Sequence, residues 1–66
     1  MFAKRLKELR IENGIMQKDL AKVLGVTIHN ISDWENQKSE TNFDMVIKIA
    51  KFFNVTVGQL LGTEEL

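Results

Sequence analysis

A single glycine joins two short segments with helical spacing of apolar residues, and this junction restricts the fold more than any other feature of the chain. In residues 17–24, two leucines and an alanine fall on one helical face, and Gly25 then supplies the residue that adopts a positive φ at least cost. A further helical segment begins after Thr27, a favourable N-cap, and runs to about Asn36. Because so short a turn leaves little room, the two helices must cross at a steep angle.

The side chains around this turn suit a steep crossing. Ala21 is small enough for the following helix to pass close by. Five apolar residues can supply the contacts between the helices: Leu20, Leu24, Val26, Ile31 and Trp34. Each signal alone is weak, but their joint occurrence in QKDLAKVLGVTIHNISDWEN predicts a helix-turn-helix at residues 17–36.

The rest of the chain predicts three more helices and no strand. Residues 2–13 carry apolar side chains at helical spacing and end at an Asn-Gly pair that suits a left-handed terminator. Residues 43–53 lie between two asparagines that suit an N-cap and a left-handed stop, with Phe53 on the inward stripe. A short helix ending near residue 61 opens with the capping box T-V-G-Q. We therefore expect an all-α, compact five-helix bundle in which residues 1–66 form one domain.

Composition limits the function. Sixty-six residues without cysteine describe a small domain that rests on packing alone, which suits a reducing cytoplasm. The start of the chain is charged throughout, so it reads as neither a signal peptide nor a membrane span. We find no nucleophile motif, glycine-rich phosphate loop or metal-ligand cluster, and expect no enzymatic activity, cofactor or metal. Nine basic and nine acidic side chains cancel, although residues 1–24, with six basic and three acidic, carry +3 and residues 25–66 carry −3.

The pattern Q-x-x-L-A-x-x-L-G-V-T-x-x-x-I-S-x-W-E-N at residues 17–36 resembles the Cro/CI-type (XRE) helix-turn-helix regulators, a family that includes phage repressors. The resemblance covers nearly the whole chain. It implies a lambda-repressor-like fold whose second and third helices form the helix-turn-helix. It also implies a homodimer that binds double-stranded DNA at a palindromic operator, in most members as a transcriptional repressor.

The third helix divides into two faces, because successive residues are rotated by about 100°. One face holds Ile31, Trp34 and Glu35, so we expect Trp34 in the core rather than stacked on a base. The opposite arc would face the major groove, and its N-terminal end would reach the base edges. The candidates for base contact are Thr27, Ile28, His29, Ser32 and Asp33.

The chemistry of these side chains suggests what they read. Ile28 can pack on a thymine methyl group, and His29 can donate to guanine or to phosphate. With no second ligand nearby in sequence, His29 is a poor candidate for a metal or catalytic role. Asp33 has two interpretations: it accepts from a cytosine amino group, or it faces water and lowers affinity by repelling the phosphate backbone.

Phosphate contacts should position the domain. The backbone N–H groups that open three helices, near Gln17, Thr27 and Asn42, can hold anions without lysine. The resemblance implies that Gln17 contacts phosphate or an outer base and that the loop after the third helix touches the backbone. The full set of candidates for phosphate contact is Gln17, Lys18, Asn30, Asn36, Lys38, Ser39, Thr41 and Asn42.

The resemblance also assigns a structural ion pair and marks three departures from the family pattern. Arg10 and Glu35 match residues that pair at the edge of the core in the family. Met16 stands where a capping residue is usual, so the second helix should lack a side-chain cap. Gln37 replaces a glycine, so Asn36 or Gln37 must take a left-handed turn. Thr41 replaces a proline, which changes the same loop.

We expect a sequence-specific DNA-binding transcriptional regulator that acts as a dimer. The alternative is an antitoxin-like or regulatory protein-interaction module with weak or lost DNA binding, which neutral charge favours slightly. Dimerisation would use residues present here or a C-terminal domain beyond residue 66. The apolar candidates for a protomer contact or a second packing face are Ile47, Phe52, Val57, Leu61 and Leu66.

Overall fold

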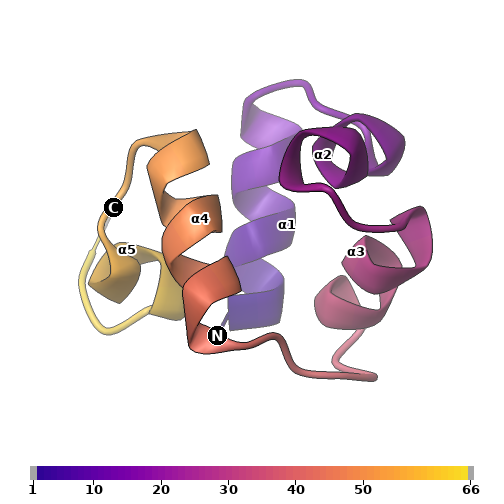
Figure 1. Ribbon diagram of the computed structural model, residues 1–66. Coiled ribbons are helices and arrows are strands. Elements are labelled where there is room, and N and C mark those ends of the chain that lie inside the picture. The colour runs from indigo at the N-terminus through magenta and orange to yellow at the C-terminus, as the bar shows by residue number, and fades with distance from the viewer. Residues whose placement is uncertain (1, 66) are drawn as a thin grey trace.

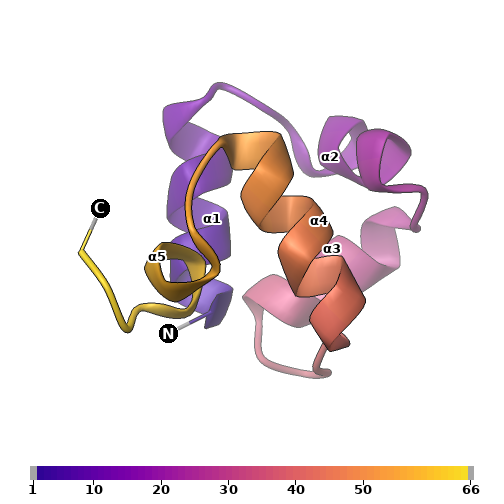
Figure 2. The same cartoon turned by 60° about the vertical axis from the view of Figure 1, so that its left-hand side comes forward.

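The computed structural model describes residues 2–65, which form five α-helices and no strand (Figure 1). In the view of Figure 1, α1 runs through the middle of the molecule, with α2 and α3 on one side of it and α4 and α5 on the other. The turned view of Figure 2 brings α4 to the front, between α1 and the pair formed by α2 and α3. This architecture confirms the predicted all-α, five-helix fold. The helices are α1 (Phe2–Glu12), α2 (Gln17–Leu24), α3 (Ile28–Glu35), α4 (Phe43–Phe53) and α5 (Val57–Leu61).

The helices begin at side-chain caps and end at left-handed residues largely as predicted. Gly25 follows α2 at φ +73°, and Asn54 follows α4 at φ +58°. The side chain of Asn42 accepts a hydrogen bond from the backbone N–H of Met45 at 2.8 Å, and Thr56 opens α5 with a reciprocal capping box. Helices α1 and α3 each end one residue earlier than predicted, which is within the usual uncertainty of helix ends.

The core is built from buried side chains of all five helices. Ala21 and Trp34 are buried, which confirms the small contact residue at the helix crossing and the core position of the tryptophan. Phe53 packs against this core, as its place on the inward stripe predicted, but it is only partly buried, and its ring also packs edge-on against the exposed Phe52 at a centroid distance of 5.0 Å. Six side chains are fully buried: Leu6, Leu20, Leu24, Ile31, Ile49 and Leu60.

The loop after α3 contains a left-handed residue, as predicted for Asn36 or Gln37. Gln37 adopts φ +59°, whereas Asn36 stays at φ −100°. The Asn36 side chain instead turns back, and its Nδ2 donates to the Ser32 carbonyl oxygen at 2.8 Å. A left-handed conformation costs a residue with a β-carbon of the order of 1 kcal/mol, so the loop is held in place at the expense of some stability.

Candidate nucleic-acid interface

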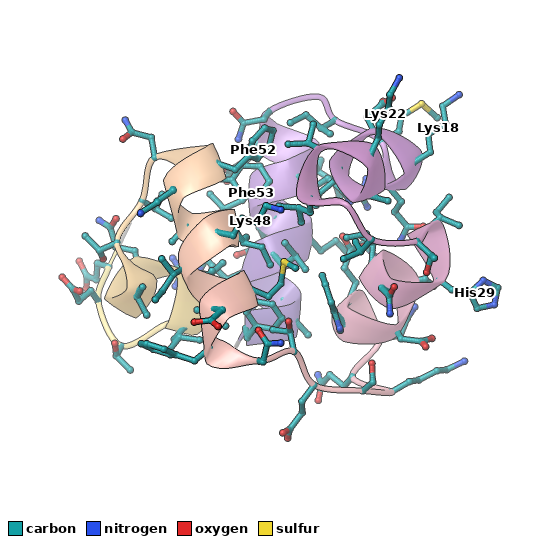
Figure 3. The ribbon with its side chains drawn as sticks, in the orientation of Figure 1. Lys18, Lys22, His29, Lys48, Phe52 and Phe53 are labelled. Atoms are coloured by element: carbon teal, nitrogen blue, oxygen red, sulfur yellow. The ribbon has the colours of Figure 1, made fainter. Side chains whose placement is uncertain are left out.

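The candidate reading residues on α3 are all at least partly accessible. Ile28 is 48% exposed, and His29 is exposed and extends away from the body of the protein (Figure 3). Ser32 and Asp33, one turn later, are half-buried. The structure therefore brings the predicted base contacts Ile28, His29, Ser32 and Asp33 onto one helix and leaves each of them at least partly accessible.

Thr27, the remaining predicted base contact, is exposed as well, but its side chain caps α3. Its Oγ1 accepts from the Asn30 backbone N–H at 3.1 Å and donates to Asn30 Oδ1 at 2.8 Å. Asn30 Oδ1 also accepts from the Thr27 backbone N–H at 3.1 Å. Sequence reasoning found the cap but missed this reciprocal box, because its partner is usually Glu or Gln. The side-chain oxygen of Asn30, a predicted phosphate contact, is therefore engaged in hydrogen bonds to Thr27.

A nearly buried carboxylate ties α3 to the two helices before it. Arg10 donates to Glu35 through Nε at 2.7 Å and through Nη2 at 3.1 Å, so the ion pair predicted from the resemblance is present. Arg10 Nη1 also donates to the carbonyl oxygen of Ile15 at 2.9 Å. The Glu35 side chain is only 2% exposed. This charge-assisted network fixes the orientation of α3 against α1.

Gln17 belongs to the same network. Its Nε2 donates to Glu35 Oε1 at 3.1 Å, although the resemblance implied that this residue contacts phosphate or an outer base. The side chain is therefore held at the start of α2, where one polar atom is engaged inside the protein. Met16, just before it, makes no side-chain cap to α2, as its residue type predicted.

The other predicted phosphate contacts differ in how free their side chains are. Lys18 is exposed and extends outward from α2 (Figure 3), and Lys38 and Ser39 are exposed in the loop after α3. Thr41 is half-buried. Asn36 and Asn42 are exposed but hydrogen-bonded, the first to Ser32 and the second as the cap of α4. The lysines and Ser39 thus have the most freedom to reach a ligand.

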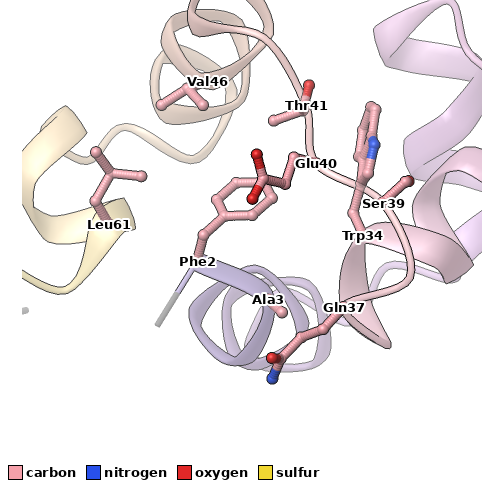
Figure 4. Close-up of a pocket in the computed structure, with 9 residues that line it drawn as sticks. All are labelled: Phe2, Ala3, Trp34, Gln37, Ser39, Glu40, Thr41, Val46 and Leu61. Atoms are coloured by element: carbon pink, nitrogen blue, oxygen red, sulfur yellow. The ribbon is translucent and has the colours of Figure 1, made fainter.

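The loop after α3 also borders an open hollow of about 370 Å³ (Figure 4). Phe2 and Ala3 of α1, Val46 of α4 and Leu61 of α5 form its other walls. Phe52 and Leu61, two of the predicted protomer-contact residues, are 38% and 36% exposed. Ile47 and Val57 are half-buried, and Leu66 lies outside the described residues.

A lysine that sequence reasoning missed supports the turn between α2 and α3. Lys48 of α4 donates from Nζ to the Leu24 carbonyl oxygen at 2.9 Å, at the C-terminal end of α2 (Figure 3). A cation suits this end of a helix because the carbonyl groups there carry partial negative charge. The donor lies 24 residues along the chain from its acceptor, so no local pattern in the sequence could have revealed the contact.

Residues 2–65 show no group of three His, Cys, Asp or Glu side chains that could hold a metal ion. None of the helices formed by these residues has the length and apolar character required to cross a membrane.

Comparison with known proteins shows similarity over nearly the whole chain. A family model described as helix-turn-helix matches residues 6–60. The chain is 40% identical over 65 residues to the HTH-type transcriptional activator BcrR of Enterococcus faecalis, covering 98% of this chain and 32% of that protein. It is 35% identical over 65 residues to the HTH-type transcriptional regulator ImmR of Bacillus subtilis, covering 98% of this chain and 51% of that protein. The chain thus spans about a third and about half of the lengths of these two relatives.

The fold also matches a solved repressor structure. The crystal structure of the P22 c2 repressor protein in complex with a synthetic operator superposes with a TM-score of 0.87 at 26% sequence identity. The match covers 97% of each chain.

Proposed function

The chain belongs to the helix-turn-helix family, and from this membership we propose that it is a sequence-specific transcriptional regulator that binds double-stranded DNA. Helix α3 enters the major groove by its N-terminal end, and Ile28, His29, Ser32 and Asp33 contact the bases. The observation that carries this proposal is that each of these side chains is at least partly accessible, on a helix that Glu35 holds against α1 and α2 through hydrogen bonds. The protein has no catalytic role, and it acts in the cytoplasm, where its operator is accessible.

Residues 1–66 form the DNA-binding domain of this regulator, with the helix-turn-helix at residues 17–36. Two copies bind a palindrome whose half-sites are about one helical turn, roughly 34 Å, apart. Repression results when the bound dimer covers a promoter. Phe52 and Leu61 are exposed apolar side chains that can contact the second copy.

Phosphate contacts come from few side chains, because the protein has no net charge. Lys18 is exposed on α2 beside the reading helix, and Lys38 and Ser39 are exposed in the loop after α3. The N-terminal N–H groups of α2 and α3 add partial positive charge. Glu40 and Asp44 oppose these contacts, so each protomer binds modestly and the dimer supplies the affinity.

A salt titration tests this function. DNA affinity should fall linearly on a log–log plot against salt concentration, because each neutralised phosphate releases counterions with a slope of about −0.9 per contact. The measurement is fluorescence anisotropy of a labelled duplex selected by the protein from random sequences. Lys18→Gln should make the slope shallower by about one, on every sequence tested.

Lys51→Gln, on the last turn of α4, serves as the matched control and should leave the slope unchanged. If the protein selects no duplex, or binds with an affinity that does not respond to salt, the DNA-binding proposal fails. That result would favour the alternative of a protein-interaction module.

A further inference from the structure

A second hollow, of about 350 Å³, opens between the N-terminal ends of α2 and α3. Its lining residues are Arg10, Met16, Gln17, Lys18 and Ile28. The two apolar members are among the exposed large hydrophobic side chains, Met16 at 59% and Ile28 at 48%. The hollow is therefore continuous with the proposed reading surface of α3, and its apolar wall has no partner within the described residues.

Most polar groups of the residues that line this hollow already make hydrogen bonds within the protein. Arg10 donates to Glu35 and to the Ile15 carbonyl oxygen, and the amide nitrogen of Gln17 also donates to Glu35. What remains accessible is an apolar wall formed by Met16 and Ile28, with the cationic Lys18 beside it. A ligand that fits this chemistry carries a small apolar group close to a negative charge.

In a DNA major groove, the C5-methyl group of a pyrimidine is such a group, and the phosphate backbone runs beside it. We infer that the hollow between Met16 and Ile28 is a subsite for a pyrimidine C5-methyl group of the operator, with Lys18 placed toward the neighbouring phosphate. This inference rests on the proposed DNA-binding function and adds Met16, which precedes α2, to the residues that choose the sequence. Met16 thus contributes to sequence recognition, although its side chain provides no cap for α2.

One consequence separates this subsite from ordinary base reading. In the major groove, thymine presents a carbonyl acceptor at C4, whereas cytosine presents an amino donor there. Thymine and 5-methylcytosine share the methyl group at C5. A subsite that contacts the methyl group through thioether and aliphatic carbons responds to that group and not to the C4 substituent. At this position of the half-site, 5-methylcytosine should therefore replace thymine, whereas unmethylated cytosine and uracil should not.

The test uses the whole protein and the duplex that it selects, with each half-site thymine replaced in turn by uracil, cytosine and 5-methylcytosine. At one position per half-site, removing the methyl group should weaken binding about fourfold for each methyl group buried. With the Met16→Ala or Ile28→Ala variant, the ratio of the affinities for the thymine and uracil duplexes at that position should fall toward one. Anisotropy competition measures each affinity.

The control is Val23→Ala, which removes an apolar side chain of comparable exposure, 52%, from a residue of α2 that does not line the hollow. It should keep the full thymine-to-uracil difference. Strong binding of the selected duplex with no methyl effect at any position would overturn the subsite and leave the DNA-binding function intact. Failure to bind any duplex would overturn both proposals, and thermal unfolding of each variant excludes loss of fold as the cause.

Discussion

Replacing Arg10 with methionine should lower the free energy of unfolding by about 3–5 kcal/mol, because it leaves the Glu35 carboxylate buried without its cation. The Glu35 side chain is 2% exposed, and only the Gln17 amide would remain as a side-chain donor to it. A domain of this size has a few kcal/mol of stability in total, so the variant should be largely unfolded at 25 °C. Urea unfolding followed by the fluorescence of Trp34, the single tryptophan, measures the loss.

A second arginine on the same helix provides the control. Arg5 lies 3.9 Å from Glu8, whose side chain is 46% exposed, so solvent screens this pair. Arg5→Met should cost less than about 1 kcal/mol. Substituting both Arg10→Met and Glu35→Leu should recover much of the stability that the single change removes, because no unpaired charge is then buried. If Arg10→Met kept its stability but lost DNA binding, Arg10 would be a DNA ligand and the assigned structural role would be wrong.

The second large effect comes from the inward face of α3. Ile31 is fully buried in the core, so Ile31→Ala should lower the free energy of unfolding by about 2–5 kcal/mol through lost burial and the cavity that remains. The same urea titration measures it. DNA binding should fall only in proportion to the unfolded fraction, and excess operator should restore it by mass action.

Ile28, one turn earlier on the same helix, is the matched comparison. It is 48% exposed, so Ile28→Ala should change the stability by no more than about 0.5 kcal/mol and act instead on DNA affinity. The two isoleucines thus separate the packing face of α3 from its reading face. Similar losses of stability in both variants would mean that α3 packs Ile28 as well as Ile31 into the core.

Local chemistry explains why the helices could be predicted so closely. Glycine or asparagine stands at the left-handed positions after α2 and α4, and Asn42 and Thr56 supply caps from their own side chains. Apolar spacing alone placed Leu20, Leu24 and Ile31 inside. Such signals act over a few residues, so one sequence carries them in full.

Features that depend on distant residues were harder to predict. The bond from Lys48 to the Leu24 carbonyl oxygen forms only after α4 has packed beside α2. The Arg10–Glu35 pair, 25 residues apart, was predicted from the family resemblance and not from any local pattern. The engagement of Gln17 with Glu35 was not anticipated for the same reason, and neither was the hollow lined by Met16 and Ile28, because both depend on how α1, α2 and α3 meet.

We propose above all that two copies of the protein read DNA through α3. Sedimentation velocity with a selected palindromic duplex tests this most directly. With half-sites one helical turn apart, about 34 Å, the complex should contain two protomers per duplex. A duplex whose half-sites are moved by half a turn should hold the second protomer much more weakly, because the two reading helices no longer face the same side of the DNA. No co-sedimentation with any selected duplex, or the same stoichiometry and affinity at both spacings, would contradict the account.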